Sequence, residues 1–228
     1  MSTTTASRNV VRRWGVGTAA VVRVLIASDD PLTGVSLASM VGVTQPRASQ
    51  VLRQLADHDA VIATPDGYVG KRAKLLDLYG VRSRPHLVEL ESHWYSTRPL
   101  PEQARRVLAL ARDRKIGLAF SADLAPDLIA PWRHPTVTIA YVDAPLPVED
   151  AGLVPAEGRA DASLIVRWTD DDGLLSPAEP WRGEVDGVPI TDPCQQWWDL
   201  LDLGGEDRAE AAARLRDAIL ERTIPRVR

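Results

Sequence analysis

The side chains best suited to recognise another molecule lie between residues 44 and 53. At the spacing of an α-helix, Gln50 and Arg53 project from the face opposite the apolar positions, and Arg47 flanks them. Guanidinium and amide groups can form paired hydrogen bonds with base edges in the major groove of DNA. The pattern therefore predicts DNA contacts on one face of a helix. The predicted contact residues are Thr44, Gln45, Arg47, Ser49, Gln50 and Arg53.

A second group of cations follows a predicted β-hairpin. Lys71, Arg72 and Lys74 come directly after it in the chain. Cations in such a place can lie along DNA phosphates and supply affinity that does not depend on base sequence. We therefore expect these three side chains to strengthen binding to any duplex.

Other functional chemistry has little support in the sequence. Cys194 is the single cysteine, which excludes an internal disulfide and a zinc site built from several cysteines. The run Asp170 to Asp172 beside Gly173 is expected to be a solvated turn rather than a metal site. The histidines show no metal-ligand spacing; they are His58, His86, His93 and His134. We therefore expect no metal, no cofactor and no catalytic residue, and the chain is interpreted as not being an enzyme.

The distribution of charge agrees with contact to a polyanion at one end. The net charge of the 228 residues is -4. Residues 1–82 hold 10 Arg or Lys against 6 Asp or Glu, whereas residues 83–228 hold 17 against 25. The first part therefore carries +4 and the second -8. A basic segment followed by an acidic one predicts contact with nucleic acid through the first part alone, although chance scatter of charge is the alternative.

Length and hydropathy bound the class of protein. A chain of 228 residues accommodates two cores. The most apolar stretch, residues 16–27, is too short to span a membrane and contains Arg23. The first nine residues lack the basic start and apolar region of a secretory signal. We therefore expect a cytoplasmic protein without a membrane segment.

The elements that would hold the contact residues are short helices and a hairpin. Thr18 is predicted to cap a helix that runs to about Ser28. In the next helix Leu37, Met40 and Val41 are spaced to form one buried stripe, and Gly42 then allows a turn.

The helix that carries the contact residues is predicted to begin at Thr44. Thr44 is a good N-cap, and Pro46 fits the first turn because its missing N–H would be unsatisfied there. The predicted buried face is Ala48, Val51, Leu52 and Leu55. Residues 61–64 and 68–70 then form the hairpin, with the turn at residues 65–67.

The rest of the chain alternates between helical and strand patterns. Residues 87–95, 116–120, 136–142 and 162–168 are predicted to be extended. Helices are predicted from Pro101 and over 123–130, and the first of them has an apolar stripe of Ala104, Val107, Leu108 and Ala111. Two more are predicted, over 195–203 with an end at Gly204 and near the C-terminus, and these two are expected to cover the sheet. Trp197 and Trp198 are adjacent on a predicted helix, so one of them is expected at a surface or an interface.

The first part resembles the helix-turn-helix of winged regulators such as the MarR type. The residues that carry this resemblance are Ala38, Gly42, Val43, Val51, Leu52 and Leu55, followed by the hairpin. The resemblance implies that the helix from Thr44 to His58 is the recognition helix and that the hairpin is the wing. A plain three-helix bundle is the alternative.

The layout of the whole chain resembles the AbiEi family, the antitoxins of type IV toxin-antitoxin systems. Three blocks carry this resemblance: FSADLAPDLIAPW at 120–132, TIAYVD at 138–143 and ITDPCQQWWDLLDLG at 190–204. The resemblance implies a second domain similar to a degenerate nucleotidyltransferase, with Ser121 to Asp123 at the start of a helix. Nucleotidyl transfer needs paired carboxylates around metal ions, and only Asp143 stands near a candidate position.

These observations predict an α+β protein with two domains. Residues 10–82 form a winged helix-turn-helix, and residues 83–228 form an α/β antitoxin-like domain. The expected function is a DNA-binding transcriptional repressor that also acts as the antitoxin of a type IV pair. The resemblance implies a nucleotidyltransferase-like toxin, encoded next to the chain, as a partner besides double-stranded DNA, and a homodimer on DNA is left open. The alternatives are a ligand-responsive MarR-like regulator without a toxin partner and an enzyme.

Overall fold

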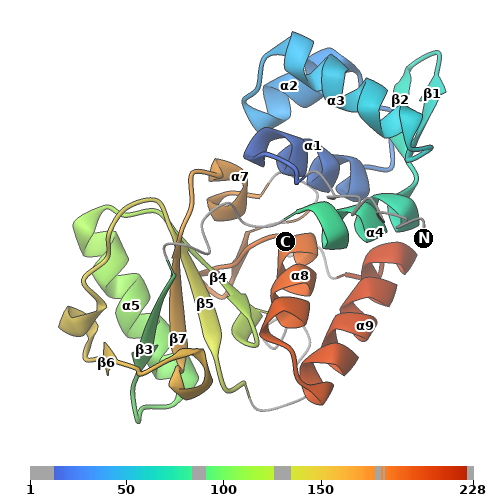
Figure 1. Ribbon diagram of the computed structural model, residues 1–228. Helices are drawn as coiled ribbons and strands as arrows, with labels where there is room; N and C mark the ends of the chain where they lie inside the picture. The colour runs from blue at the N-terminus through green and yellow to red at the C-terminus, as the bar shows by residue number, and fades with distance from the viewer. Residues whose placement is uncertain (1–12, 84–90, 126–134, 178–180, 182, 225–228) are drawn as a thin grey trace, which may run out of the picture.

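The computed structural model describes residues 13–83, 91–125, 135–177, 181 and 183–224 (Figure 1). Helices and strands both contribute, which confirms the mixed α+β class. The first three helices and a small hairpin lie at one end of the molecule, and a five-stranded sheet lies at the other. Within these described ranges, no helix is both long and apolar enough to cross a membrane.

The first helix, α1 (Val16–Ala27), is the apolar centre of its end of the molecule. Its N-cap is Gly15, and the predicted start at Thr18 is wrong. Thr18 is buried in the first turn of the helix, where its hydroxyl accepts a hydrogen bond from Arg47 at 3.0 Å. Thr18 therefore connects α1 to the helix predicted to contact DNA.

The second helix, α2 (Gly34–Val41), is capped at both ends as its sequence suggests. The Thr33 side chain accepts a hydrogen bond from the Ser36 amide, and Gly42 ends the helix in the left-handed region with φ 68°. Leu37 is buried as predicted, but Met40 is 42% exposed. The predicted stripe is therefore wrong at Met40, because Leu37 and Ala38 are the residues of this short helix that face the core.

The third helix, α3 (Gln45–Asp57), agrees with the prediction. Thr44 is its N-cap residue, although its side chain forms no capping hydrogen bond, and Pro46 lies in the first turn. The four predicted core residues are buried, namely Ala48, Val51, Leu52 and Leu55. This apolar stripe fixes which face of α3 points to solvent.

The predicted hairpin is confirmed as β1 (Val61–Thr64) and β2 (Gly67–Gly70), which pair antiparallel. Gly67 follows the turn with φ 139°, and a Cβ there would lie 2.7 Å from the Leu32 carbonyl. Leu32 also exchanges backbone hydrogen bonds with Tyr68, so the hairpin is anchored to the loop before α2. The chain then enters α4 (Arg72–Arg82).

The five-stranded sheet has the order β4-β5-β7-β3-β6. β5 and β7 are parallel, and the other neighbouring strands are antiparallel. The strands are β3 (Glu91–Tyr95), β4 (Leu118–Ala122), β5 (Thr138–Val142), β6 (Val154–Pro155) and β7 (Leu164–Trp168). The predicted segments 116–120, 136–142 and 162–168 exist as β4, β5 and β7, each beginning two residues later than expected. β3 covers the last five residues of the predicted segment 87–95, and residues 87–90 lie outside the described ranges.

The two faces of the sheet carry different side chains. One face packs against α5 (Leu100–Arg114), whose predicted stripe meets Phe120, Ala140 and Val166. The alternate residues Ile139, Tyr141 and Ile165 lie on the opposite face, because side chains alternate along a strand. Smaller elements complete the fold: η2 (Val148–Ala151), η3 (Arg159–Asp161), α7 (Asp172–Leu175), β8 (Glu184–Val185) and β9 (Val188–Pro189).

The last two helices, α8 (Pro193–Leu203) and α9 (Glu206–Glu221), only partly follow the prediction. α8 contacts β4, but α9 packs on α8, and its buried residues Ala211, Ala212 and Ile219 join the core of α1 to α4. The expectation that both helices cover the sheet is therefore wrong for α9.

Both adjacent tryptophans of α8 are buried, each 7% exposed. Trp197 lies against Gly80 of α4. The guanidinium carbon of Arg167 lies over the Trp198 ring, 5.9 Å from the ring centroid. The expectation that one of them is at a surface is wrong, because α8 has the sheet on one side and α4 on another.

The hydrophobic core of α1 to α4 continues into the C-terminal helices. Leu25 and Tyr79 belong to the same cluster of buried residues as Trp197 and Leu200. The predicted division after residue 82 thus crosses a shared core, and the division itself stays a prediction. The predicted helix at 123–130 lies mostly outside the described residues, as do His86, Trp132 and His134.

Candidate nucleic-acid interface

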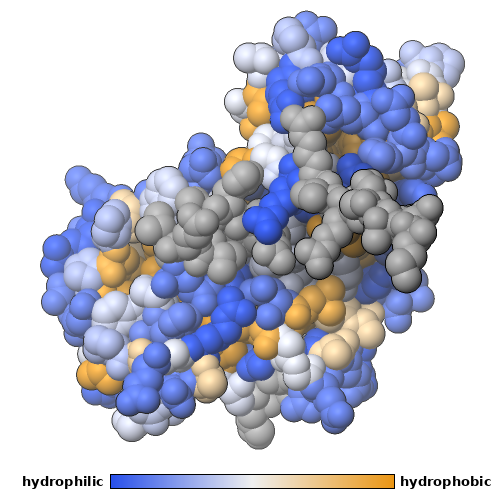
Figure 2. Space-filling model, in the orientation of Figure 1, coloured by the Kyte–Doolittle hydropathy of each residue, from blue (hydrophilic) through white to orange (hydrophobic). Residues whose placement is uncertain are grey.

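The predicted base-contact residues share the solvent face of α3. Five of them are exposed, and Ser49 is half-buried. The exposed residues are Thr44, Gln45, Arg47, Gln50 and Arg53. Figure 2 shows mostly hydrophilic residues over this end of the molecule. The structure therefore brings these six positions together on one accessible surface.

Arg47 is held in place by neutral partners. Its Nη1 donates to Gln50 Oε1 at 2.8 Å, and its Nη2 donates to Thr18 Oγ1 at 3.0 Å. An amide and a hydroxyl orient the guanidinium without neutralising its charge. The Arg47 and Gln50 side chains are thus arranged side by side, with the positive charge still available to an anion.

Arg53 is the second cation of this face. Its Nε donates to the Ser49 carbonyl at 3.4 Å, a long hydrogen bond within the same helix. Its side chain is exposed. Arg53 therefore presents its charge to solvent on the exposed surface of α3.

The three cations after the hairpin have different surroundings. Lys71 donates to Asp59 Oδ1 at 2.5 Å, and this bond together with the charges of Lys71 and Lys74 lowers the pKa of Asp59. Lys74 is exposed. Arg72 is only 14% exposed; it donates to the Ile26 carbonyl and pairs with Asp29, both at 2.7 Å. The structure therefore places Lys71 and Lys74 at the surface and Arg72 against the end of α1.

Most arginines of the described residues pair with carboxylates, but those around α3 do not. Within the described ranges, no carboxylate forms an ion pair with Arg13, Arg47, Arg53 or Arg82. Arg82 instead contacts His58 Nε2 at 3.1 Å. Sequence reasoning did not single out Arg13 or Arg82. The only sequence signal for these two residues is the positive charge of residues 1–82, to which both contribute.

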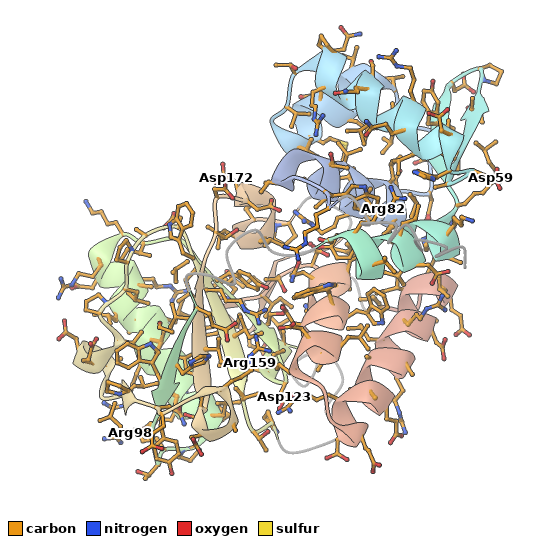
Figure 3. The ribbon with its side chains drawn as sticks, viewed as in Figure 1. Asp59, Arg82, Arg98, Asp123, Arg159 and Asp172 are labelled. Carbon is orange, nitrogen blue, oxygen red and sulfur yellow. The ribbon has the colours of Figure 1, made fainter. Side chains whose placement is uncertain are left out.

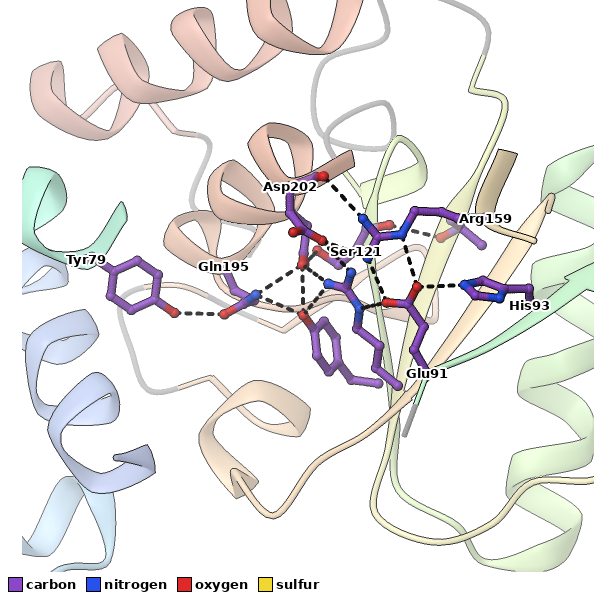
Figure 4. A network of polar contacts seen from close by, with 11 residues as sticks. Tyr79, Glu91, His93, Ser121, Arg159, Gln195 and Asp202 are labelled. Carbon is purple, nitrogen blue, oxygen red and sulfur yellow. Dashed lines mark hydrogen bonds and ion pairs between the residues drawn. The ribbon is translucent and has the colours of Figure 1, made fainter. Parts of the chain in front are cut away.

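A buried polar network lies between α8 and the five-stranded sheet (Figure 4). Asp199 of α8 accepts hydrogen bonds from Tyr141 at 2.8 Å, Gln195 at 3.2 Å and Arg167 at 2.7 Å. It also accepts one from the Ser121 hydroxyl at 2.5 Å. Burial raises the pKa of the Asp199 carboxyl to about 6, against the effect of Arg167 and these hydrogen bonds.

The network ends near the sheet surface at Glu91. Its carboxylate accepts from Arg159 and Arg167, each at 2.9 Å, and contacts His93 at 2.7 Å. Partial burial would raise the pKa of Glu91, but these hydrogen bonds and the charge of Arg167 lower it to about 2. Asp202 pairs with the same two arginines.

In the other direction the network reaches α1. Tyr79 of α4 donates to Gln195 Oε1 at 2.8 Å, and Arg23 of α1 donates to the Tyr79 hydroxyl at 3.4 Å. Arg23 forms ion pairs with Asp171 and Asp192, each at 2.8 Å. Asp171 is 6% exposed and caps α7, so the expectation of a solvated turn is wrong at this residue, because a buried arginine needs carboxylate partners.

The three sequence blocks behind the AbiEi resemblance meet in this network. Ser121 comes from the first block, Tyr141 from the second, and Gln195 and Asp199 from the third. Ser121 lies within β4, so the expectation that it starts a helix is wrong. Ser121, Tyr141 and Asp199 are fully buried, which makes their contact with one another, rather than with a substrate, the role the geometry supports.

Asp143 and the other acidic groups do not assemble a metal site in the part of the chain that the structure describes. Asp143 Oδ1 accepts a hydrogen bond from the Gly117 amide at 2.9 Å, beside the start of β4. Its carboxylate therefore links the end of β5 to the residue just before β4.

Comparisons with known proteins add no assignment. No family model matches this chain, and neither the curated proteins nor the solved structures contain a match.

Proposed function

We propose that this chain is a DNA-binding transcriptional repressor whose α1, α2 and α3 form a helix-turn-helix and whose β1 and β2 form the wing. The observation that carries the proposal is the gathering of arginines around the exposed face of α3 that have no carboxylate partner among the described residues. Elsewhere in the described residues most arginines are neutralised by acidic neighbours.

In this proposal α3 enters the major groove and its side chains read bases. Arginine can pair with the O6 and N7 atoms of guanine, and glutamine with the N6 and N7 atoms of adenine. Arg47 and Gln50 already lie together, which reduces the conformational entropy lost on binding. Lys71 and Lys74 contact phosphates beside the groove, whereas Arg72 holds the end of α1. No catalytic step is assigned to the chain.

The test is the affinity for DNA from the region upstream of its own gene. Arg53→Ala should weaken specific binding by about 1 to 3 kcal/mol in gel shifts at fixed salt. Arg105→Ala on α5 is the matched control, because it removes one exposed arginine that also has no ion pair in the described ranges. Equal affinities of the two variants and the wild type would reject α3 as the reading helix.

The antitoxin role is proposed for the sheet and α8, and the convergence of the three blocks on one network supports it. Because the core crosses the predicted domain boundary, point variants of the full chain are a safer test than halves. Arg53→Ala should weaken repression yet still relieve growth arrest by a nucleotidyltransferase-like toxin encoded beside the gene. Loss of rescue together with loss of repression would mean that the chain acts by repression alone.

A ligand-responsive regulator is the second candidate, and a cavity of about 590 Å³ favours it. The cavity lies between α1 and α2 on one side and α7 on the other, and Met40, Arg23 and Asp172 are among its lining residues. Figure 3 shows Asp172 on α7, toward these helices. A small molecule that releases the wild-type protein from DNA, but not a Met40→Trp variant that fills the cavity, would favour this function.

A further inference from the structure

A groove of about 330 Å³ runs between the start of α1, the side of α3 and the end of α4. Arginines from three different segments line it: Arg13 before α1, Arg47 on α3 and Arg82 at the end of α4. The neutral side chains Gln50 and Gln54 lie along its α3 side. No carboxylate is among the residues that line the groove in the described part of the chain.

Three guanidinium groups around one small groove repel one another unless an anion is present. Their contacts in the structure do not relieve this repulsion, because Arg47 binds a hydroxyl and an amide and Arg82 contacts an imidazole nitrogen. Most arginines in the C-terminal part of the described chain have carboxylate partners. Arg159, for example, pairs with both Glu91 and Asp202. The groove therefore has the charge and the donors of a phosphate site.

The position of the groove connects it to the exposed face of α3. Arg47 and Gln50 belong both to the groove and to that face. An anion in the groove would thus lie beside any duplex that α3 contacts. A backbone phosphate of the same duplex can be this anion, so no second ligand is needed.

We propose that the groove holds a phosphodiester of duplex DNA between Arg13 and Arg82, and so fixes the position of α3 in the major groove. This inference rests on the proposed function and adds two contact residues to it. Arginine suits this role because its fork of N–H donors binds phosphate oxygens in pairs. Arg47 would then bridge the phosphate and the reading face of α3.

The experiment measures binding of the full chain to a fluorescently labelled duplex by anisotropy at several salt concentrations. The variants are Arg13→Gln, Arg82→Gln and Arg82→Lys, with Arg105→Gln on α5 as the control for loss of one charge. Loss of one phosphate contact should lower the slope of log affinity against log salt by about one, which weakens binding about eightfold at about 0.1 M salt. Arg82→Lys should retain most of the slope, and Arg105→Gln should match the wild type.

The outcomes separate this inference from the proposed function. Wild-type slopes in both glutamine variants, with weaker binding by Arg53→Ala, would reject the groove and leave the reading helix intact. No duplex binding by the wild type would reject both. Calorimetry with pyrophosphate adds a further measurement. The inference would be overturned if pyrophosphate binding required Arg13 and Arg82 while both glutamine variants kept wild-type affinity for the duplex. That result would assign the groove to a soluble phosphate.

Discussion

Arg23 is the single charged side chain of the otherwise largely apolar helix α1. It is 5% exposed, and two carboxylates from distant segments, Asp171 and Asp192, surround its guanidinium. Burial of a charge is costly unless it is paired, so these three residues depend on one another. They join α1 to the segments before α7 and α8.

We expect Arg23→Met to lower the free energy of unfolding by about 3 to 5 kcal/mol, because two buried carboxylates lose their partner. Denaturant unfolding measures this change. The matched control is Arg216→Met, which breaks the exposed pair with Asp77 and should cost less than about 1 kcal/mol. Similar losses in the two variants would mean that the Arg23 pairs contribute no more than a surface ion pair.

Asp199 should make stability depend on pH in a defined window. Its pKa in the folded protein is raised to about 6 from an ordinary value of 3.8. The folded state therefore binds the proton more tightly than the unfolded state does. The resulting contribution of Asp199 to the free energy of unfolding is complete below about pH 4 and is lost as pH rises through about 6. Between these limits wild-type stability should fall with rising pH, relative to Asp199→Asn, by about 2 to 3 kcal/mol. Parallel pH profiles of the two proteins would contradict this assignment.

Among the elements, those that contain their own signals were predictable. A cap, a proline in the first turn and an apolar stripe identified α3, and turn residues identified the hairpin. The helix α5 followed from its stripe, and the end of α8 followed from Gly204. Each of these signals lies within the element that it defines or directly beside it.

The features that sequence reasoning missed depend on distant neighbours. Asp171 is buried because Arg23, far away in the chain, needs a carboxylate. Trp197 and Trp198 are both buried because α8 is covered on two sides. The groove arginines Arg13 and Arg82 come together only through the packing of α1 and α4, and no local pattern carries that information.

Two glycines test how the hairpin is held. Gly67 and Gly42 both have positive φ, but only Gly67 would place a Cβ within 4 Å of other atoms, 2.7 Å from the Leu32 carbonyl. Gly42→Ala should cost about 1 to 2 kcal/mol of stability for its left-handed backbone. Gly67→Ala should lower stability further, because the backbone of Leu32 must also move to make room for the new Cβ. Chemical denaturation of both variants checks the order, and a larger loss at Gly42 would contradict the close packing of the hairpin.

The whole molecule is joined by both apolar and polar contacts across the predicted boundary after residue 82. The shared core includes Leu25, Tyr79 and Trp197, and the hydrogen bonds of Arg23 and Tyr79 cross the same boundary. We therefore expect a single cooperative unfolding transition. Far-UV circular dichroism and tryptophan fluorescence should give coincident thermal curves. Two separated transitions would mean that the two parts fold independently despite these contacts.

The central claim is that α3 reads DNA bases. Selection of bound duplexes from a random-sequence library, followed by sequencing, measures this most directly. The wild type should enrich one motif, and Lys74→Ala should enrich the same motif with lower affinity. Gln50→Ala and Arg53→Ala should each relax the preference at particular base positions and leave the others intact. An unchanged motif in both α3 variants, or no enriched motif for the wild type, would contradict the account.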